Sequence, residues 1–421
     1  MNTQIYFICF RILHSADVKL NDLPQSVMVN HFTGSTCLTT KSGLIKTLND
    51  NLQFFTDEDP STFFPRAYDL SSMNDMQSFV NDFLISKART ALRDFVTHCC
   101  NAQKDDVIIN QGVLNILFEV VKNNSADNKR EYLDGPAILR QNTISDIETE
   151  VILNSAIWMY NPVTQQSNGN GTKFDVQNVT NPLDIFLPRS KRQSEHSREE
   201  HKEHERMKKN TLKRRERAFE LMNSVRKVKE MDVLRIRNIV SQETVEATLS
   251  EESNLWIVKP ASKSRGRGIA LFASLPKILR YVQASEQKLS QWCVQKYIEK
   301  TMLISNRRFD VRQWVLVTSF DPLTVWFYND CYVRFASEEY IVSSDGSQHS
   351  HDKKWLGNPF KHLVNNSINK NNGEKFGKIF TAENGENVYE HMWKIDQLKK
   401  VIVEIVFHLF TELILHAQMI V

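Results

Sequence analysis

The sequence predicts a mixed α/β protein with two or three domains. It has 421 residues, of which 41% are hydrophobic and 24% charged, enough for a sizeable buried core. Apolar residues recur with a helical period at 79–96 and 113–121, whereas short runs from residue 255 onward alternate as strands do. We therefore expect helices in the first part of the chain and a sheet in the last part.

Composition excludes several classes of protein. The 53 basic and 50 acidic residues give a net charge of +3, which offers no argument for nucleic-acid binding. The six cysteines form no CxxC pair, so we expect free thiols in a reducing compartment and neither a disulfide framework nor a zinc site. Arg11 interrupts the apolar run 5–10 too early for a signal peptide. These features predict a cytoplasmic protein.

Changes in composition divide the chain into four segments. Residues 1–160 mix short apolar runs with helical patterns and predict an N-terminal α/β domain. Residues 161–188 are rich in Asn, Gly, Thr and Gln and predict a linker. A charged helical segment is expected at 189–250, and residues 251–421 carry the strand patterns and the motifs.

The charged segment is most basic at 189–230. This stretch holds 15 Lys or Arg and 8 Asp or Glu, a local charge of 15 − 8 = +7, and contains no Pro or Gly. The pattern predicts a long exposed helix. Its charge is either that of a solvated helix face or an electrostatic contact for an acidic partner, and its histidines, His196, His201 and His204, are expected to be solvated.

Residues 401–421 are mostly apolar and about as long as a membrane span. Glu404, His408, Glu412 and His416 recur every four residues and share one helical face. Because two glutamates are unfavourable in lipid, this spacing favours an amphipathic helix on a core over a membrane anchor or a metal stripe. The chain stops within this helix without a cap, which predicts a C-terminally truncated domain.

A basic glycine loop joins two of the predicted strands. LWIVK and GIALF alternate like strands, and SKSRGRG lies between them. Gly266 and Gly268 would let the backbone approach an anion that Arg265 and Arg267 neutralise, so phosphate is the expected ligand. The spacing fits neither a Walker loop nor a dinucleotide fingerprint, and an ordinary surface turn remains the alternative.

Charged side chains also lie on the strands that follow. RRFDVRQWVLVTSF alternates over a long run, so period two places Asp310, Arg312 and Trp314 on one strand face, where a structural ion pair is the simplest explanation. The predicted strands together carry four cations: Lys259, Lys296, Arg312 and Arg334. Burying them side by side is unfavourable unless an anion lies among them, and we expect that anion to be a nucleotide.

These phrases resemble the tubulin tyrosine ligase-like family, whose members are ATP-grasp ligases that add amino acids to proteins. WIVKP, SRGRGI, VQKYI, RFDVRQWVLVT, PLTVWFY, YVRF and HLVNNSINK occur in the family's order between residues 256 and 370. FDVRQW, PLTVWFY and HLVNN, with FFPRAYDL and FVNDF upstream, look most like the glycylase branch, which joins glycine to glutamate side chains of tubulin. The resemblance implies an ATP-grasp ligase fold, with ATP and glycine as substrates and tubulin and microtubules as partners.

The resemblance also implies roles for individual residues. Lys259 would contact the α- and β-phosphates of ATP, and Arg334 would bind the incoming amino acid or a phosphate oxygen. Asp310 and Arg312 would line the catalytic cleft. Asn365 resembles the asparagine of the family's HLTN motif, and Val364 replaces the threonine of that motif.

Twelve residues are expected to bind ATP. They are Lys259, Arg265, Gly266, Arg267, Gly268, Ile269, Gln295, Lys296, Tyr297, Ile298, Arg308 and Asn365. Residues 265–269 would form the loop that covers the phosphates, and residues 295–298 would hold the adenine, largely through backbone groups. Arg308 stands where the family usually has lysine, so the charge is kept while the geometry changes.

The implied chemistry has two steps. A glutamate γ-carboxylate takes the γ-phosphate of ATP, and the amine of glycine then attacks the acyl phosphate. Mg²⁺ should accompany ATP, but neither metal motif of the family, YGxDF or ExN, is found after residue 370. We therefore expect these 421 residues to hold no metal ligands, to be marginally stable and to transfer no glycine by themselves, whereas a chain with both motifs would be active.

Two alternatives remain open. The chain could belong to a glutamate or tyrosine ligase of tubulin, or to a non-catalytic protein that binds nucleotide and microtubules. In each case we expect a monomer without nucleic-acid or membrane partners, located in the cytoplasm at the cytoskeleton, cilium or axoneme.

The basic stretch 189–230 provides a first testable prediction. If it attracts the glutamate-rich tail of tubulin, its deletion should weaken microtubule binding, and binding should fall steeply as salt rises. Each exposed ion pair contributes only about 0.2–1 kcal/mol and is screened over ~8 Å at physiological ionic strength. Cosedimentation at low and high salt tests this, with a deletion of the linker 161–188 as the control. Unchanged affinity and salt dependence would show that the stretch is merely solvated.

Overall fold

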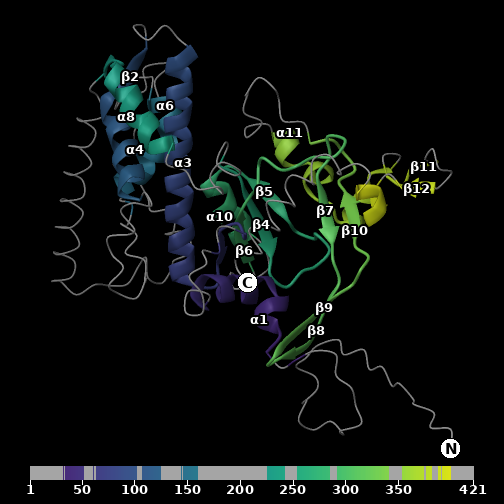
Figure 1. Cartoon of the computed structure of the whole chain (residues 1–421). Coiled ribbons are helices and arrows are strands. Elements are labelled where there is room, and N and C mark those ends of the chain that lie inside the picture. Colours follow the sequence, from purple (N-terminus) through teal and green to yellow (C-terminus); the bar gives the residue numbers. More distant parts are fainter. Residues whose placement is uncertain are drawn as a thin grey trace, which may run out of the picture.

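The computed structural model of the chain shows helices beside two sheets (Figure 1). It describes residues 32, 34–51, 60, 63–101, 107–124, 144, 146–159, 225–241, 254–284, 292–340, 353–373, 376–381, 387–389 and 391–399. A group of long helices lies on one side of a four-stranded sheet. A five-stranded sheet and a separate hairpin lie on its other side.

The helical group is built around the longest helix. Its members are α3 (Met73–Asn101), α4 (Gln111–Asn123), α6 (Asp146–Trp158) and α8 (Glu230–Ser241). Helix α4 starts at Asn110, whose side-chain oxygen accepts hydrogen bonds from the amides of Gly112 and Val113 at 3.2 and 3.3 Å. The strands β2 (Ile108–Asn110) and β3 (Val225–Lys227) pair antiparallel beside these helices. Helices α3 and α4 confirm the two helical patterns predicted from the sequence.

The four-stranded sheet is antiparallel and has the order β1-β6-β4-β5. Its strands are β1 (Ala67–Asp69), β4 (Trp256–Pro260), β5 (Ala270–Phe272) and β6 (Trp292–Lys296). One face carries Trp256, Val258 and Val294, which share a hydrophobic core with α3 and with α10 (Leu275–Ala284). Phe79 of α3 lies edge-on to Trp256, with 5.1 Å between ring centroids. The predicted hairpin of β4 and β5 is confirmed.

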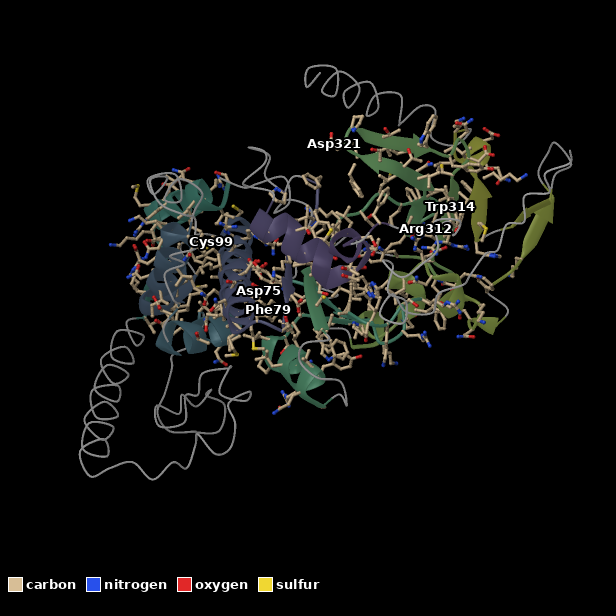
Figure 2. The ribbon with its side chains drawn as sticks, turned by 90° about the horizontal axis from the view of Figure 1, so that it is seen from below. Asp75, Phe79, Cys99, Arg312, Trp314 and Asp321 are labelled. Carbon is tan, nitrogen blue, oxygen red and sulfur yellow. The ribbon has the colours of Figure 1, made fainter. Side chains whose placement is uncertain are left out.

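The N-terminal part and the sheet share this core. Strand β1 pairs with β6, so that Ala67 lies opposite Gln295 and Asp69 opposite Cys293. The core continues from Leu70 to Val294 without a break between the two parts of the chain. Figure 2 shows Asp75 and Phe79 on α3 and Cys99 near its far end. The division into four segments remains a prediction, but the described N-terminal residues pack together with the sheet.

The remaining elements surround this centre. The second sheet has the order β11-β12-β13-β10-β7, and the hairpin contains β8 and β9. These strands are β7 (Phe309–Arg312), β8 (Val315–Phe320), β9 (Leu323–Phe327), β10 (Tyr332–Phe335), β11 (Ile379–Thr381), β12 (Asn387–Tyr389) and β13 (Met392–Lys394). The short helices are α1 (Thr36–Thr39), α2 (Lys41–Lys46), α11 (Lys353–Leu356), α12 (Pro359–His362) and α13 (Asn366–Asn369), with a π-helical turn at Thr47–Asn51.

The long alternating run that contains FDVRQW is two strands and not one. Strands β7 and β8 belong to different sheets, and the break falls at Gln313 and Trp314. The Gln313 side chain donates hydrogen bonds to the carbonyl oxygens of Trp314 and Tyr328 at 3.0 and 2.7 Å, and the Tyr328 amide donates to the Trp314 carbonyl oxygen at 3.0 Å, so Trp314 pairs with the hairpin side of the break. Trp314 therefore lies outside β7 and is 66% exposed. The prediction that it shares one strand face with Asp310 and Arg312 is wrong.

Only the end of the basic stretch 189–230 is described. Val225–Lys227 form strand β3 and not the continuation of a helix, because they pair with β2, and α8 begins at Glu230. The predictions for residues 189–224 and for the helix at 401–421 lie outside the described residues. Among the described helices, none combines the length and apolar composition that crossing a bilayer requires.

The shared core predicts that the N-terminal part and the sheet unfold together. Phe79→Ala should lower the free energy of unfolding by about 3–5 kcal/mol, because it removes a fully buried ring between α3 and Trp256. Phe63→Ala is the matched control, since Phe63 is 62% exposed and its loss should change the free energy by less than about 0.5 kcal/mol. Chemical denaturation followed by tryptophan fluorescence and circular dichroism measures both. Separate transitions, of which Phe79→Ala shifts only one, would contradict a shared core.

Candidate functional site

Two polar side chains lie on the face of the four-stranded sheet opposite to helix α3. Lys259 Nζ donates a hydrogen bond to Gln295 Oε1 at 2.5 Å, and Gln295 Nε2 donates to the carbonyl oxygen of Pro65 at 3.2 Å. Burial, followed by the nearby ammonium of Lys41, lowers the pKa of Lys259 to about 8. An ammonium destabilised in this way is stabilised by an anion placed beside it.

The loop between β4 and β5 has the backbone geometry that an anion-binding loop needs. Arg265, Gly266 and Gly268 have φ angles of 62°, 77° and 73°, in the left-handed region that favours glycine. A Cβ atom on Gly266 would lie 2.4 Å from Ile368 Cδ1 and 2.9 Å from Asn365 Oδ1, so the Ile368 and Asn365 side chains would have to shift to accommodate it. Ser367 Oγ donates to the carbonyl oxygen of Arg265 at 2.7 Å. The loop is therefore held against the start of α13.

A cavity of about 380 Å³ lies where this loop meets β7, β10 and α13. It is lined by Arg265, Arg312, Arg334, Asn365, Asn366, Ser367 and Lys370. Four of these side chains are cations and the other three are uncharged hydrogen-bonding groups. Such a lining is suited to phosphate or carboxylate groups, which accept hydrogen bonds from several donors at once.

One carboxylate lies beside this cavity and fixes one of its arginines. The register of β7 and β10 places Asp310 opposite Arg334. Arg334 donates from Nε and Nη2 to the two carboxylate oxygens of Asp310 at 2.9 and 2.5 Å. Arg312 Nε lies 3.7 Å from the same carboxylate, which confirms that the side chains of Asp310 and Arg312 share one space. One negative charge beside four cations leaves a local charge of 4 − 1 = +3 for an anionic ligand.

Figure 2 shows where this part of the site lies relative to the hairpin. Arg312 and Trp314 are close together at the root of the β8–β9 hairpin, and Asp321 marks its tip. Arg312 is half-exposed, whereas Arg334 is largely buried. Of these two arginines, Arg334 is therefore the fixed one and Arg312 the more accessible one.

Of the four cations predicted on the strands, Arg312 and Arg334 line the cavity, Lys259 is not among its lining residues, and Lys296 faces the core. Strand register pairs Lys296 with Trp256, so its side chain lies on the face toward α3 and is 1% exposed. Its Nζ donates to Asn254 Oδ1 at 3.1 Å and lies 3.9 Å from a carboxylate oxygen of Glu299. The prediction that its ammonium joins the other three cations around one anion is wrong. Period two turns Lys296 to the face opposite to its neighbour Gln295.

The backbone of the predicted adenine segment is partly occupied. The amide of Lys296 donates to the carbonyl oxygen of Arg66 at 2.8 Å, and the amide of Tyr297 donates to that of Leu255 at 3.0 Å. Each amide has one hydrogen, so neither can also donate to an adenine ring. The adenine contact expected at residues 295–298 would therefore use backbone carbonyl oxygens or the amide of Ile298.

Arg308 and Tyr297 belong to a buried polar network. Arg308 Nη1 donates to the Tyr297 hydroxyl at 2.6 Å and to the carbonyl oxygen of Ile298 at 3.0 Å. His362 Nε2 lies 2.8 Å from the carbonyl oxygen of Trp355, which can only accept, so Nδ1 accepts from the Tyr297 hydroxyl at 2.9 Å. Burial lowers the pKa of His362 to about 4, which keeps the ring neutral at pH 7. Arg308 therefore orders the segment after β6 and does not line the cavity.

Some residues of the site were not singled out from the sequence. Asn366, Ser367 and Lys370 line the cavity next to the predicted Asn365, within the phrase HLVNNSINK. Extending the Asn365 assignment along the phrase would have found them. Lys41 contacts the loop between β4 and β5 from more than 200 residues upstream, and no sequence signal indicated it.

The other predicted loop residues differ in position. Arg267 is exposed, and its Nε lies 3.5 Å from the carbonyl oxygen of Ser264. Ile269 packs against a hydrophobic cluster that includes Ile257 and Tyr297. A Cβ atom on Gly268 would lie 3.0 Å from Pro260 Cγ, so a small residue is favoured there too.

Mg²⁺ is expected to accompany ATP and needs oxygen ligands from the protein. Within the described ranges, no group of three or more His, Cys, Asp or Glu side chains could hold a metal ion. Both carboxylate oxygens of Asp310 already accept hydrogen bonds from Arg334. Mg²⁺ prefers several hard oxygen ligands in octahedral geometry, and these residues do not fit it.

The chain is similar in sequence to a family of ligases. A model of the tubulin-tyrosine ligase family matches residues 189–420, more than half of the 421 residues. The chain is 32% identical over 371 residues to tubulin glycylase 3C of Tetrahymena thermophila and 32% identical over 368 residues to tubulin monoglycylase TTLL3 of Danio rerio. It is 28% identical over 373 residues to protein monoglycylase TTLL8 of Mus musculus.

These three alignments cover most of this chain but a minority of each relative. They include 85%, 84% and 84% of the chain, and 32%, 40% and 37% of the respective relatives. The chain thus spans about a third of the length of the relatives it matches. The mixed helix and sheet structure agrees with the predicted ATP-grasp fold. With the family model matched over more than half of its residues, the chain belongs to the tubulin-tyrosine ligase family.

Proposed function

We propose that this chain forms the nucleotide-binding part of an ATP-dependent ligase that joins glycine to glutamate side chains of tubulin. The relatives named tubulin glycylase and tubulin monoglycylase support glycine as the donor and tubulin as the acceptor. Such a protein would act where microtubules are, at the cytoskeleton and in cilia or axonemes. The observation that carries the proposal is the cavity of +3 charge beside the loop between β4 and β5.

The proposed binding mode assigns the phosphates to the cationic groups. Lys259 leads into the loop and would contact the α- and β-phosphates, while residues 265–269 cover them. The cavity lined by Arg312 and Arg334 would receive the γ-phosphate or the carboxylate of the incoming amino acid. Carbonyl oxygens near Ile298 would face the adenine. In this arrangement Asp310 is a positioning residue, because it fixes the Arg334 guanidinium by two hydrogen bonds.

The proposed reaction brings anions together in both of its steps. The γ-carboxylate of the acceptor glutamate attacks the γ-phosphorus of ATP, the bond to the β-phosphate oxygen breaks, and ADP leaves. The amine of glycine then attacks the carbonyl carbon of the acyl phosphate, inorganic phosphate leaves, and the nitrogen loses a proton as the amide forms. Fixed cations such as Arg334 stabilise the charge that develops, because they need not reorient as it forms.

The first test concerns ATP binding. Lys259→Ala should weaken ATP binding by about 2 kcal/mol, or roughly 30-fold in Kd, because it removes one charged partner of a buried contact. Lys122→Ala is the control, since Lys122 is half-exposed on α4. Isothermal titration calorimetry measures both. Equal affinities for the Lys259→Ala variant and the unaltered protein would remove Lys259 from the site.

The pKa of Lys259 also predicts how ATP affinity depends on pH. The ammonium must be protonated to bind phosphate, and its pKa of about 8 is below the ordinary value of 10.5. Affinity should therefore be constant below about pH 7 and fall as pH rises through 8, by up to tenfold per pH unit. Calorimetry between pH 6.5 and 9.5 tests this, and the fall should be absent in Lys259→Ala. An identical profile in both proteins would contradict the assignment.

The second test concerns the transferred amino acid. A protein that carries this chain and the YGxDF and ExN motifs should incorporate labelled glycine into tubulin in the presence of ATP and Mg²⁺. Arg334→Ala should reduce incorporation at least 100-fold, whereas Arg280→Ala, an exposed change on α10, should leave it unchanged. Incorporation of labelled glutamate or tyrosine in place of glycine would support the other ligase activities. ATP binding without any transfer would support a non-catalytic role.

A further inference from the structure

A short N-terminal helix lies beside the loop between β4 and β5. Helix α2 (Lys41–Lys46) is separated from that loop by more than 200 residues, and Figure 1 shows it with α1 next to the four-stranded sheet. Thr40 caps its start, because the Thr40 side chain accepts a hydrogen bond from the amide of Gly43 at 3.0 Å. The helix is therefore a defined element and not an arbitrary stretch of the N-terminal part.

Helix α2 is anchored to the sheet by one buried side chain. Ile45 is 4% exposed and packs in a small hydrophobic cluster with Ala67 of β1 and Cys293 of β6. Ala261, the residue that follows β4, packs against the same cluster. Ile45 thus fixes α2 against both the sheet and the first residue of the loop.

The residue one turn before this anchor reaches the loop itself. Lys41 and Ile45 are four residues apart and so share one face of the helix. Lys41 Nζ donates hydrogen bonds to the carbonyl oxygens of Pro260 and Lys263 at 3.0 and 2.7 Å, and lies 3.5 Å from that of Ala261. An ammonium has three hydrogens, which is enough for all three of these carbonyl oxygens at the end of β4 and in the loop that follows it.

We propose that Lys41 is a positioning residue that, from the N-terminal helix α2, holds the loop between β4 and β5, residues 261–269, in its binding geometry. The inference rests on the proposed function, since it concerns the same nucleotide site. The loop is then held on both sides of its positive-φ residues Arg265, Gly266 and Gly268, by Lys41 at Lys263 and by Ser367 at Arg265. A loop fixed before ATP arrives loses less conformational entropy on binding.

Lys41 also affects the charge at the site. The charged and titratable groups that face Lys259 are Lys41 from α2 and Cys293 from β6, and Asp69 of β1 acts in turn on Cys293. The Lys41 ammonium disfavours a second positive charge nearby and contributes to the lowered pKa of Lys259. Removal of the Lys41 ammonium should therefore have two effects: it should release the loop, and it should raise the pKa of Lys259. Removal of a lysine that only stabilised helix α2 would have neither effect.

The test compares three variants of the full chain. Lys41→Met keeps the aliphatic stem and removes the ammonium. Lys41→Arg keeps the charge but changes its geometry, and Lys46→Met is the matched control on the exposed end of the same helix. Hydrogen exchange of the nucleotide-free protein reports on the loop, where the amides of Arg267 and Ile269 donate to Ser264 and Gly266 carbonyl oxygens. Calorimetry with ATP between pH 6.5 and 9.5 gives the affinity and its pH profile.

The proposal makes a distinct prediction for each variant. Lys41→Met should exchange the loop amides roughly tenfold faster and bind ATP roughly tenfold more weakly at pH 7, while the pH at which affinity falls moves upward from about 8. Lys41→Arg should keep the original pH profile, because the charge is retained. Lys46→Met should match the unaltered protein in every measurement.

Two results would overturn the proposal. One is unchanged loop exchange, ATP affinity and pH profile in Lys41→Met. The other is an equal effect in Lys46→Met, which would show that α2 stabilises the fold in a general way. If the unaltered protein does not bind ATP, or if Lys259→Ala binds it normally, the proposed function fails instead. The exchange measurement without nucleotide still decides whether Lys41 holds the loop.

Discussion

The alternation of β4 and β6 is the constraint on which the rest of the structure depends. Because successive side chains point to opposite faces, Trp256, Val258 and Val294 enter the core with α3 while Lys259 and Gln295 lie on the other face. The apolar face binds the sheet to the helices, and the polar face presents a cation where β4 runs into the glycine loop. A shift of register by one residue would bury Lys259 against Phe79 and expose Trp256. Packing and the position of the site are therefore set by the same register.

The N-terminal part of the chain completes a site whose charged residues come mostly from residues 259–370. The carbonyl oxygen of Pro65, two residues before β1, accepts a hydrogen bond from the Gln295 side-chain amide, which fixes the Gln295 oxygen toward Lys259. Helix α2 supplies the ammonium that contacts the loop. Both contacts join segments more than 200 residues apart. The upstream phrase FFPRAYDL thus contains both strand β1 and Pro65, whose carbonyl oxygen orients Gln295 of the candidate nucleotide site.

The guanidinium groups of Arg334 and Arg308 are held in place by two different kinds of contact. Asp310 fixes the Arg334 guanidinium by a two-pronged contact, which leaves a preformed positive cavity. Arg308 is instead held by the hydroxyl of Tyr297 and by two aromatic faces, with the rings of Tyr297 and Tyr340 at 4.5 and 4.9 Å. The neutral His362 completes that second group. Only the contact between Asp310 and Arg334 directs positive charge into the cavity.

Local patterns in the sequence determined the parts of this protein that depend on neighbouring residues. Helical periodicity predicted α3 and α4, and alternation around SKSRGRG predicted the β4–β5 hairpin with its glycine loop. The family resemblance assigned ATP-binding, catalytic or amino-acid-binding roles to Arg265, Arg312, Arg334 and Asn365, and these four residues line one cavity. Only the tertiary structure decided that Lys296 faces the core, that the run through Trp314 is broken between two sheets, and that Lys41 reaches the loop. These depend on strand register and on contacts between distant segments, for which a single sequence carries no local signal.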